Sequence, residues 1–139
     1  MRISTCHSTV VLAFLLAACA GPGSGEPPLT LEQRLQSSGL RQGESVSVIR
    51  GFRLSSWTYL DETHIQVSSA IGDDYLITFH MPCWGLQTAD AIAHTSTVGA
   101  LSRHDRILAR SAGMPVNCSI RDIHALEPIS KTDPQGERS

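Results

Sequence analysis

The run Leu15-Leu16-Ala17-Ala18-Cys19 constrains this chain most, because it separates a segment that is removed from a segment that folds. Arg2 supplies a positively charged start, and the apolar stretch before the cysteine is too short to span a bilayer as a helix. This pattern is typical of a bacterial lipoprotein signal. It predicts removal of residues 1–18 and acylation of Cys19. The alternative is an ordinary signal peptide cut near Ala18 or Ala20, which would leave an odd cysteine in the mature chain.

The predicted lipid anchor sets the expected location. Two or three acyl chains hold a protein stably at a membrane, whereas one chain holds it only marginally. Ala20 follows the cysteine at the position where aspartate would favour retention in the inner membrane of enteric bacteria. We therefore expect the outer membrane, with the domain facing the periplasm. The expected partners are the membrane itself, through Cys19, and an envelope protein.

The size and charge of the mature chain exclude some classes of function. Removing residues 1–18 from the 139 leaves 121 residues, which is enough for one small domain. The mature chain keeps 10 Lys and Arg against 13 Asp and Glu, a net charge of −3 with histidine neutral. Nine of the cationic residues are arginines, and they are spread singly along the chain. Without a basic patch, binding to nucleic acid is disfavoured.

Cys83 and Cys118 remain as a pair once Cys6 leaves with the signal and Cys19 carries lipid. In an oxidising compartment, two cysteines most simply form one disulfide. Such a bond would stabilise the fold by roughly 3 to 4 kcal/mol through the entropy of the closed loop. Two alternatives stay open for these residues, a zinc site completed by a histidine and a nucleophilic thiol.

Composition divides the mature chain into three parts. Residues 19–28 form a tether rich in Gly, Ser and Pro, residues 29–127 a single domain, and residues 128–139 a polar tail that is predicted to be disordered. At the start of the domain, Thr30 is placed to cap a short helix that runs through Ser38. Gly39 is placed to end that helix.

After the helix, short apolar runs rich in β-branched and aromatic residues predict strands. The predicted strands are Val46–Ile49, Ser56–Leu60, His64–Ser69, Tyr75–Met81 and Arg106–Ala109. Turn residues separate the second, third and fourth of them, which predicts a meander. Within it, Ile65 and Val67 share one face of their strand.

The rest of the domain is less regular in sequence. Residues 86–93 are expected to form a short helix or an irregular segment. Apolar residues recur at every third position in Ile120, Ile123 and Leu126, which fits a helical turn leading into a strand and does not separate the two elements. The predicted fold class is α+β but mostly β: a small antiparallel sheet or partly open barrel, with one or two short helices, stapled by one disulfide.

The histidines carry no recognisable motif. Those that survive processing are His64, His80, His94, His104 and His124. None of them stands in a His-x-x-x-His or His-Glu-x-x-His arrangement, and the sequence Gly-x-Ser-x-Gly does not occur. We therefore predict no catalytic residues, no metal site and no cofactor.

The densest polar cluster is Arg103-His104-Asp105-Arg106. Its first interpretation is a solvated loop before a strand, and the alternative is a polar surface site formed by His104, Asp105 and Arg106. The aromatic residues Trp57, Tyr59, Tyr75, Phe79 and Trp84 are expected to pack in the core. If one sheet face proves exposed, those rings would instead offer a ligand or partner surface.

Several short segments between Ile49 and Leu126 carry a family resemblance. They are Ile49-Arg50-Gly51-Phe52, Trp57, Tyr75-Leu76-Ile77, Pro82-Cys83-x-x-Leu86, Asp105-x-Ile107 and Cys118-x-Ile120-x-x-Ile123. In these segments the chain resembles a family of short proteobacterial envelope proteins described only as a domain of unknown function. The resemblance implies a small lipoprotein or secreted protein and supports the Cys83–Cys118 pair. It implies no catalytic residues.

These observations predict a lipid-anchored envelope protein whose domain is a non-enzymatic interaction or structural module. The tether and anchor would concentrate that domain at one membrane surface. Two alternatives remain. One is a periplasmic protein that binds a small ligand or a metal through Cys83, Cys118 and a nearby histidine, and the other is a hydrolase of an unfamiliar kind.

Overall fold

The computed structural model describes residues 27–96 and 99–130 of the chain. The predicted signal peptide, Cys19, the tether as far as residue 26 and the tail from residue 131 lie outside the described residues. The helices are α1 (Leu31–Ser37) and the 3-10 helix η1 (Leu86–Thr88). The strands are β1 (Leu40–Ser45), β2 (Val48–Arg50), β3 (Leu54–Asp61), β4 (His64–Ser69), β5 (Asp74–Phe79), β6 (Ile92–His94), β7 (Ala100–Ser102), β8 (Arg106–Ser111) and β9 (Met114–Pro128).

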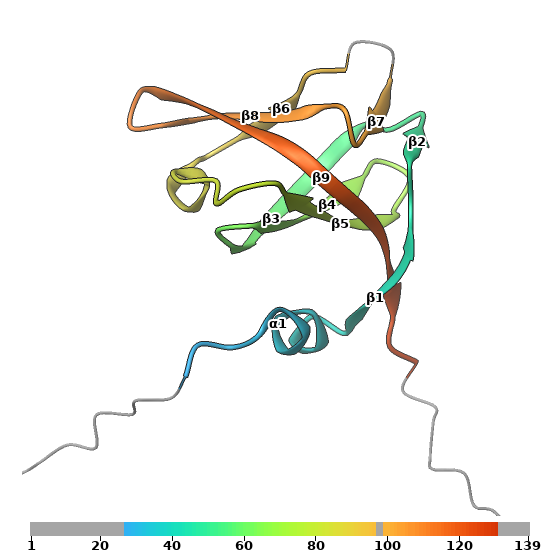
Figure 1. Ribbon diagram of the computed structural model, residues 1–139. Helices are drawn as coiled ribbons and strands as arrows, with labels where there is room; N and C mark the ends of the chain where they lie inside the picture. Colours follow the sequence, from blue (N-terminus) through green and yellow to red (C-terminus); the bar gives the residue numbers. More distant parts are fainter. Residues whose placement is uncertain (1–26, 97–98, 131–139) are drawn as a thin grey trace, which may run out of the picture.

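Seven of the strands form one curled antiparallel sheet in the order β3-β4-β5-β9-β8-β6, and β1 also pairs with β9. Strand β9 is the longest and runs through the middle of this sheet, while β2 and β7 form a separate two-stranded sheet (Figure 1). The curled sheet closes only half of a barrel. The predicted class, mostly β with a partly open barrel, is therefore confirmed.

Helix α1 forms where the sequence predicts it. The Thr30 hydroxyl accepts a hydrogen bond from the Gln33 N–H, and the Gln33 side chain accepts one from the Thr30 N–H, which completes a capping box. Gly39 follows the helix with φ +73°, a left-handed conformation that glycine adopts at little cost. The helix buries Leu35 against the outer face of the sheet.

Strands β3 to β5 form the predicted meander, and the register pairs Tyr59 with Ile65 and Ile65 with Ile77. Ile65 and Val67 are both buried on the concave face, as their alternation predicts. The prediction of one strand at Val46–Ile49 was wrong in its bounds. The polar segment Leu40–Ser45 is already a strand because it pairs with the edge of β9, and a new strand begins at Val48.

Of the two elements that fitted residues 118–126, the structure forms the strand and no helical turn, because β9 is extended throughout. Two features produce the three-residue spacing of its apolar positions. The register against β5 shifts between Ile120 and Asp122, so one extra residue, Arg121, keeps Ile120 and Ile123 on the same face. Leu126 then lies on the opposite face, in a different cluster from Ile123.

Two apolar clusters hold the sheet from its two faces. The main core lies on the concave face and contains buried residues from six strands, including Ile65, Ile77, Phe79 and Ile123. The second is a cluster of six leucines on the outer face: Leu31, Leu35, Leu40, Leu60, Leu76 and Leu126. Strands β5 and β9 contribute to both clusters, so both of their faces are covered.

The predicted end of the domain lies slightly early. Strand β9 includes Pro128, and the Ile129 N–H donates a hydrogen bond to the Gly39 carbonyl 2.8 Å away. This bond ties the first residues of the predicted tail to the end of α1, so residues 128 and 129 are part of the folded domain.

Candidate functional site: the Trp84 groove

An apolar groove of about 530 Å³ lies between the loop of residues 82–85 and the end of the β8–β9 hairpin. On the hairpin side its walls are Ser111 and residues 114–118. We call it the Trp84 groove. It contains no charged side chain, and the disulfide forms part of its lining.

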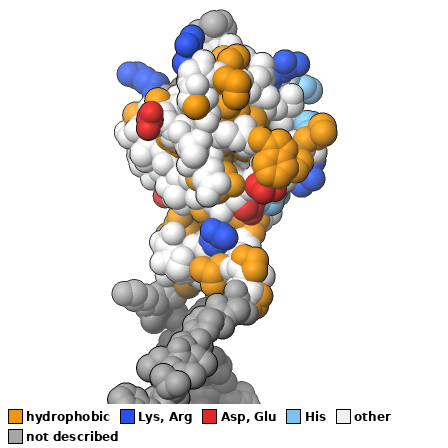
Figure 2. Space-filling view, turned by 90° about the vertical axis from the view of Figure 1, so that its left-hand side faces the viewer, with side chains coloured by type: hydrophobic (Ala, Val, Ile, Leu, Met, Phe, Trp, Pro, Cys, Tyr) orange, Lys and Arg blue, Asp and Glu red, His pale blue; other side chains and the backbone are white. Residues whose placement is uncertain are grey.

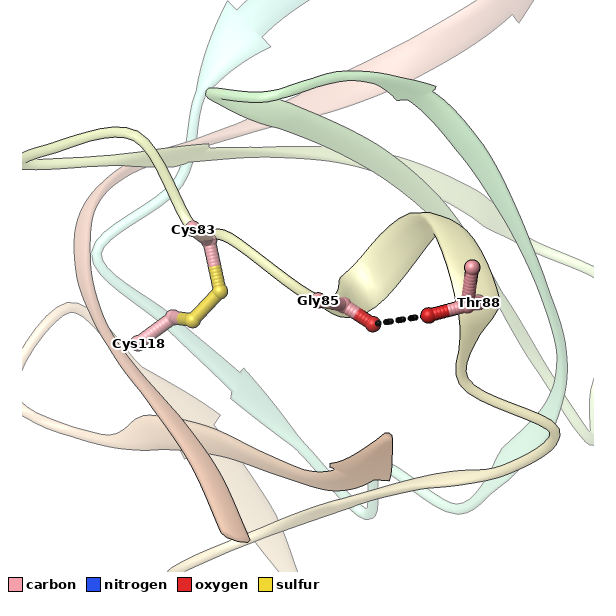
Figure 3. Close-up of a disulfide and its surroundings, with 4 residues drawn as sticks. All are labelled: Cys83, Gly85, Thr88 and Cys118. Atoms are coloured by element: carbon pink, nitrogen blue, oxygen red, sulfur yellow. Dashed lines mark hydrogen bonds between the residues drawn. A yellow bond between two sulfur atoms is a disulfide. The ribbon is translucent and has the colours of Figure 1, made fainter. Parts of the chain in front are cut away.

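The loop side of the groove is fixed by the way in which β5 ends. The Cys83 N–H donates to the Glu62 carbonyl at 2.6 Å, which draws the chain away from the line of β5. Cys83 is bonded to Cys118 of β9, with 5.7 Å between their Cα atoms (Figure 3). The predicted disulfide is therefore confirmed. It leaves neither cysteine as a thiolate for metal binding or nucleophilic attack, which removes both alternatives for this pair.

Gly85 lets the loop pack closely on the hairpin. Its φ is +95°, and a Cβ atom there would lie 3.0 Å from Val116 Cγ2 and 3.3 Å from Ser111 Cβ. The following turn, η1, is held by a hydrogen bond from the Thr88 hydroxyl to the Gly85 carbonyl, 3.4 Å (Figure 3). The same hydroxyl lies 2.6 Å from the Ser111 hydroxyl. The groove is thus bounded by two segments that are joined covalently and by hydrogen bonds.

The side chains around the groove are unusually exposed for their size. Trp84 and Met114, which line the groove, are each 69% exposed. Figure 2 shows the side of the molecule where the β8–β9 hairpin ends, and apolar side chains reach the surface there in separate groups. The prediction that Trp84 packs in the core was wrong. The same prediction of core packing is confirmed for Phe79, which is buried, and for Trp57, Tyr59 and Tyr75, which pack against the main core.

The predicted polar cluster lies elsewhere, in the loop between β7 and β8. The Asp105 carboxylate accepts hydrogen bonds from the Ser102 N–H and hydroxyl, both at 2.8 Å, and from the Thr95 hydroxyl at 3.1 Å. Partial burial opposes its ionisation, but these hydrogen bonds outweigh that effect and lower the pKa of Asp105 below its ordinary value. His104 and Arg106 are exposed on either side. The carboxylate therefore shapes the loop, and none of the three residues lines the Trp84 groove.

The histidines do not converge on one site. His64 Nδ1 lies 2.8 Å from the Asp61 carboxylate in the β3–β4 turn, and the His94 ring packs edge-on against Phe52. Among the described residues, the buried Nδ1 atoms of His94 and His124 have no hydrogen-bond partner. Within residues 27–96 and 99–130, no group of three His, Cys, Asp or Glu side chains is placed to hold a metal ion.

Two other surface hollows differ from the Trp84 groove in character. One, of about 330 Å³, is bordered by the exposed side chains of Val48 and Ile71. The other, of about 610 Å³, is mainly polar and contains Tyr59, Asp61 and Glu62. Neither is closed by a covalent bond. The groove could have been suspected from Cys83-Trp84-Gly85 in the sequence, where a tryptophan stands between a constrained cysteine and a turn glycine.

The fold and the groove define a small, disulfide-stapled antiparallel β domain with an exposed tryptophan. The chain belongs to DUF6491, a family of unknown function, whose sequence profile matches residues 1–137. This agrees with the resemblance to a family of unknown function, while the envelope location that the resemblance implies stays a prediction. No curated protein and no solved structure matches the chain. None of the helices in the described part of the chain is long and apolar enough to cross a membrane.

Proposed function

We propose that this chain is a lipid-anchored envelope protein whose domain is a non-enzymatic interaction module that binds a partner at the Trp84 groove. The observation that carries this proposal is the 69% exposure of Trp84 over an uncharged groove. Tryptophan is enriched among the residues that supply most of the binding energy in protein interfaces. Isolated exposed apolar residues are common, but here Trp84 and Met114, each 69% exposed, line the same hollow.

The rigidity of the groove supports the same function. Binding loses less free energy when the surface is already ordered, because few side chains and loops must be fixed on association. The disulfide and the contact of Gly85 with Val116 hold the two walls before any partner arrives. Met114 adds a flexible apolar side chain that can adapt to the partner's shape.

The chemistry of the reactive side chains favours binding over catalysis. Both cysteines of the domain are oxidised, and the Asp61 and Asp105 carboxylates are engaged by neighbouring N–H and hydroxyl groups of their own turns. Among the candidates that the sequence suggested, Cys83, Cys118 and Asp105 are therefore held in contacts within the domain. Each of them has a structural role that does not require a substrate.

A cross-linking experiment tests the binding function. A photoreactive amino acid in place of Met114 should cross-link a partner in living cells, and Trp84→Ala in the same chain should abolish the product. Ile71 is the matched control, because it is 79% exposed but borders a different hollow. Products that form equally from residues 71 and 114, or that survive Trp84→Ala, would contradict the proposal.

The lipid anchor is tested separately. The chain should incorporate labelled palmitate and fractionate with the outer membrane, and Cys19→Ser should abolish both. An intact mass measurement should show a chain that begins at acylated Cys19. A mature chain that begins at another residue, or that carries no lipid, would contradict the anchor without affecting the groove.

A second candidate function uses the same groove for a small apolar ligand. Its volume of about 530 Å³ lies within the range of about 300 to 1,000 Å³ that is usual for small-molecule sites. Native mass spectrometry of the protein purified from its own membrane distinguishes the two functions. A bound small molecule that disappears with Trp84→Ala would favour the ligand-binding function.

A further inference from the structure

Strand β9 has an open edge that faces the Trp84 groove. Strand β5 pairs with β9 only as far as Ile120, and its last contact beyond that is the hydrogen bond from the His80 N–H to the Ser119 carbonyl, 3.2 Å. Before Ser119, β9 pairs with β8 on its other edge, from Ser119 to Met114. The groove therefore occupies the position that a continuation of β5 would fill.

The orientation of the backbone along β9 shows which groups face the groove. The Ser119 carbonyl points towards β5, and the Ile120 N–H points the other way, to the Asp105 carbonyl. Because successive residues of a strand direct their N–H and C=O groups to opposite edges, Asn117 and Pro115 face the same edge as Ser119. In the described part of the chain, no hydrogen bond reaches the Asn117 N–H or C=O from that side.

We propose that the Trp84 groove binds an extended peptide segment of a partner protein by strand addition to this edge of β9. The Asn117 N–H would donate to a carbonyl of the peptide, and the carbonyls of Asn117 and Pro115 would accept from its N–H groups. Alternate side chains of an added strand point to one face, so one of them would pack on Trp84. This inference rests on the proposed function, because it specifies how the groove binds a partner.

The lining of the groove defines the chemistry of that peptide. Because no charged side chain lines the groove, a charged peptide side chain would lose its hydration without finding a counter-charge. The bound side chains are therefore uncharged and apolar, and the main-chain hydrogen bonds supply the alignment. A long charged peptide is excluded for the same reason.

Pro115 argues against a second copy of this chain as the occupant. Proline has no N–H to donate, and natural proteins use it on edge strands to prevent pairing between identical copies. Two copies aligned edge to edge would each bring a proline to the shared ladder. A partner peptide that has its own N–H groups can still bond to the Pro115 carbonyl and to both groups of Asn117.

The test uses random peptides displayed on phage and selected against the full chain. The selected peptides should contain apolar residues at alternate positions, and Trp84→Ala should abolish their binding. The decisive pair of variants is Asn117→Pro and Asn117→Ala. The first removes the N–H that faces the groove and leaves the bonds to β8 in place, whereas the second removes only the side chain.

We expect Asn117→Pro to weaken binding of a selected peptide by about tenfold or more, and Asn117→Ala by about threefold or less. Circular dichroism and the persistence of the disulfide establish that each variant is folded. A second measurement changes the peptide and leaves the protein unchanged. N-methylation of alternate peptide amides should abolish binding when the methylated amides face β9, and should not abolish it when they face away. Equal binding by Asn117→Pro and Asn117→Ala together with tolerance of N-methylation in both registers would overturn strand addition.

The outcomes separate this inference from the proposed function. Cross-links from residue 114 could depend on Trp84 while peptide binding tolerates both Asn117→Pro and N-methylation. The groove would then bind a partner, but not by strand addition. Failure to enrich any peptide relative to Trp84→Ala would overturn strand addition. A chain that forms dimers through this edge, detected by sedimentation and lost with Asn117→Pro, would replace the peptide with a second copy.

Discussion

The two halves of strand β9 experience opposite environments. Between Ile120 and Pro128 the strand pairs with β5 from Ile120 to Leu126 on one edge and with β1 from His124 to Pro128 on the other, and apolar clusters cover both of its faces. From Met114 to Ser119 it forms a ladder only with β8, and the disulfide cross-links it to the loop that follows β5. We call these the closed half and the open half of β9.

The comparison teaches that one strand can separate stability from binding. The closed half gains its stability from hydrogen bonds and burial that no partner could share. The open half retains an unpaired edge and exposed apolar side chains, which are liabilities in a purely structural strand. The disulfide fixes the position of the open half without covering its edge.

Hydrogen exchange should show the largest difference between the two halves. The Ile123 N–H lies in the closed half within the main core, whereas the Asn117 N–H faces the groove without a described partner. Exchange from a buried core strand requires global opening, and exchange from an open edge does not. We expect Asn117 to exchange about a thousandfold faster or more, as measured by NMR. Similar rates would show that the edge is covered in solution.

Truncation of apolar side chains should also distinguish the halves. Ile123 is fully buried, so Ile123→Ala should lower the free energy of unfolding by about 4 kcal/mol through lost burial and a cavity. Val116 in the open half is only partly buried, and Val116→Ala should cost about 1 kcal/mol or less. Urea denaturation measures both variants. Comparable costs would mean that the open half contributes to the core as much as the closed half does.

Removal of the disulfide should affect the open half more than the closed half. The double variant Cys83→Ala, Cys118→Ala opens a loop of sequence separation 35 and should lower the free energy of unfolding by roughly 3 to 4 kcal/mol. Because the bond holds one wall of the groove, Trp84 fluorescence should change in the folded variant. The amide of Ile123 should keep its relative protection. If the Ile123 amide lost its protection before the amides of the open half did, the disulfide would stabilise mainly the closed half.

The sequence predicted the parts of this fold that depend on local patterns. Thr30 and Gly39 bound a helix because capping and left-handed backbone are local properties, and Ile65 and Val67 reveal β4 because alternation is local too. The disulfide followed from the number of cysteines. These predictions required no knowledge of which strands pair.

The sequence could not predict features that depend on distant pairing. Strand β1 has few apolar residues and is a strand only because β9 offers it an edge. The three-residue spacing in β9 imitates a helix because Arg121 is a bulge and because the strand has two buried faces. The exposure of Trp84 likewise depends on where the Cys83–Cys118 bond holds its loop, which the general expectation that aromatic residues pack in the core does not take into account.

Asp105 lies where the two halves of β9 meet, because its carbonyl accepts the Ile120 N–H. Its folded-state pKa is lowered by hydrogen bonds from Ser102 and Thr95, so the carboxylate stabilises the fold above its unfolded pKa of about 3.9. This contribution is lost as the pH falls through the lower, folded-state pKa. Asp105→Asn should cost about 1 to 2 kcal/mol at neutral pH.

The pH dependence of that cost is the measurement. The difference in unfolding free energy between the wild type and Asp105→Asn should be constant from neutral pH to about pH 5 and should shrink below about pH 4. Thermal unfolding across that range measures it. A difference that grows on acidification would contradict the stabilising role of the ionised carboxylate.

The smallest expected effect lies at the end of the open half. Ser111 pairs with Met114, so Ala112 and Gly113 form a two-residue hairpin loop, with φ values of +49° and +81°. Two successive positive φ angles are typical of a type I′ turn, in which asparagine is favoured and alanine is strained. Ala112→Asn should therefore raise the free energy of unfolding by about 0.5 to 1 kcal/mol.

Gly113→Ala is the matched control for this turn. A Cβ atom there meets no other atom within 4 Å, so any loss of stability comes from the backbone conformation alone. The two substitutions should shift the melting temperature in opposite directions. Because the hairpin is paired on one edge only, relief of its strain should also slow exchange of the open-half amides that are bonded to β8, while the Asn117 amide stays fast. No shift in either variant would show that the end of the open half is not held in this turn in solution, and the groove would then lack its second rigid wall.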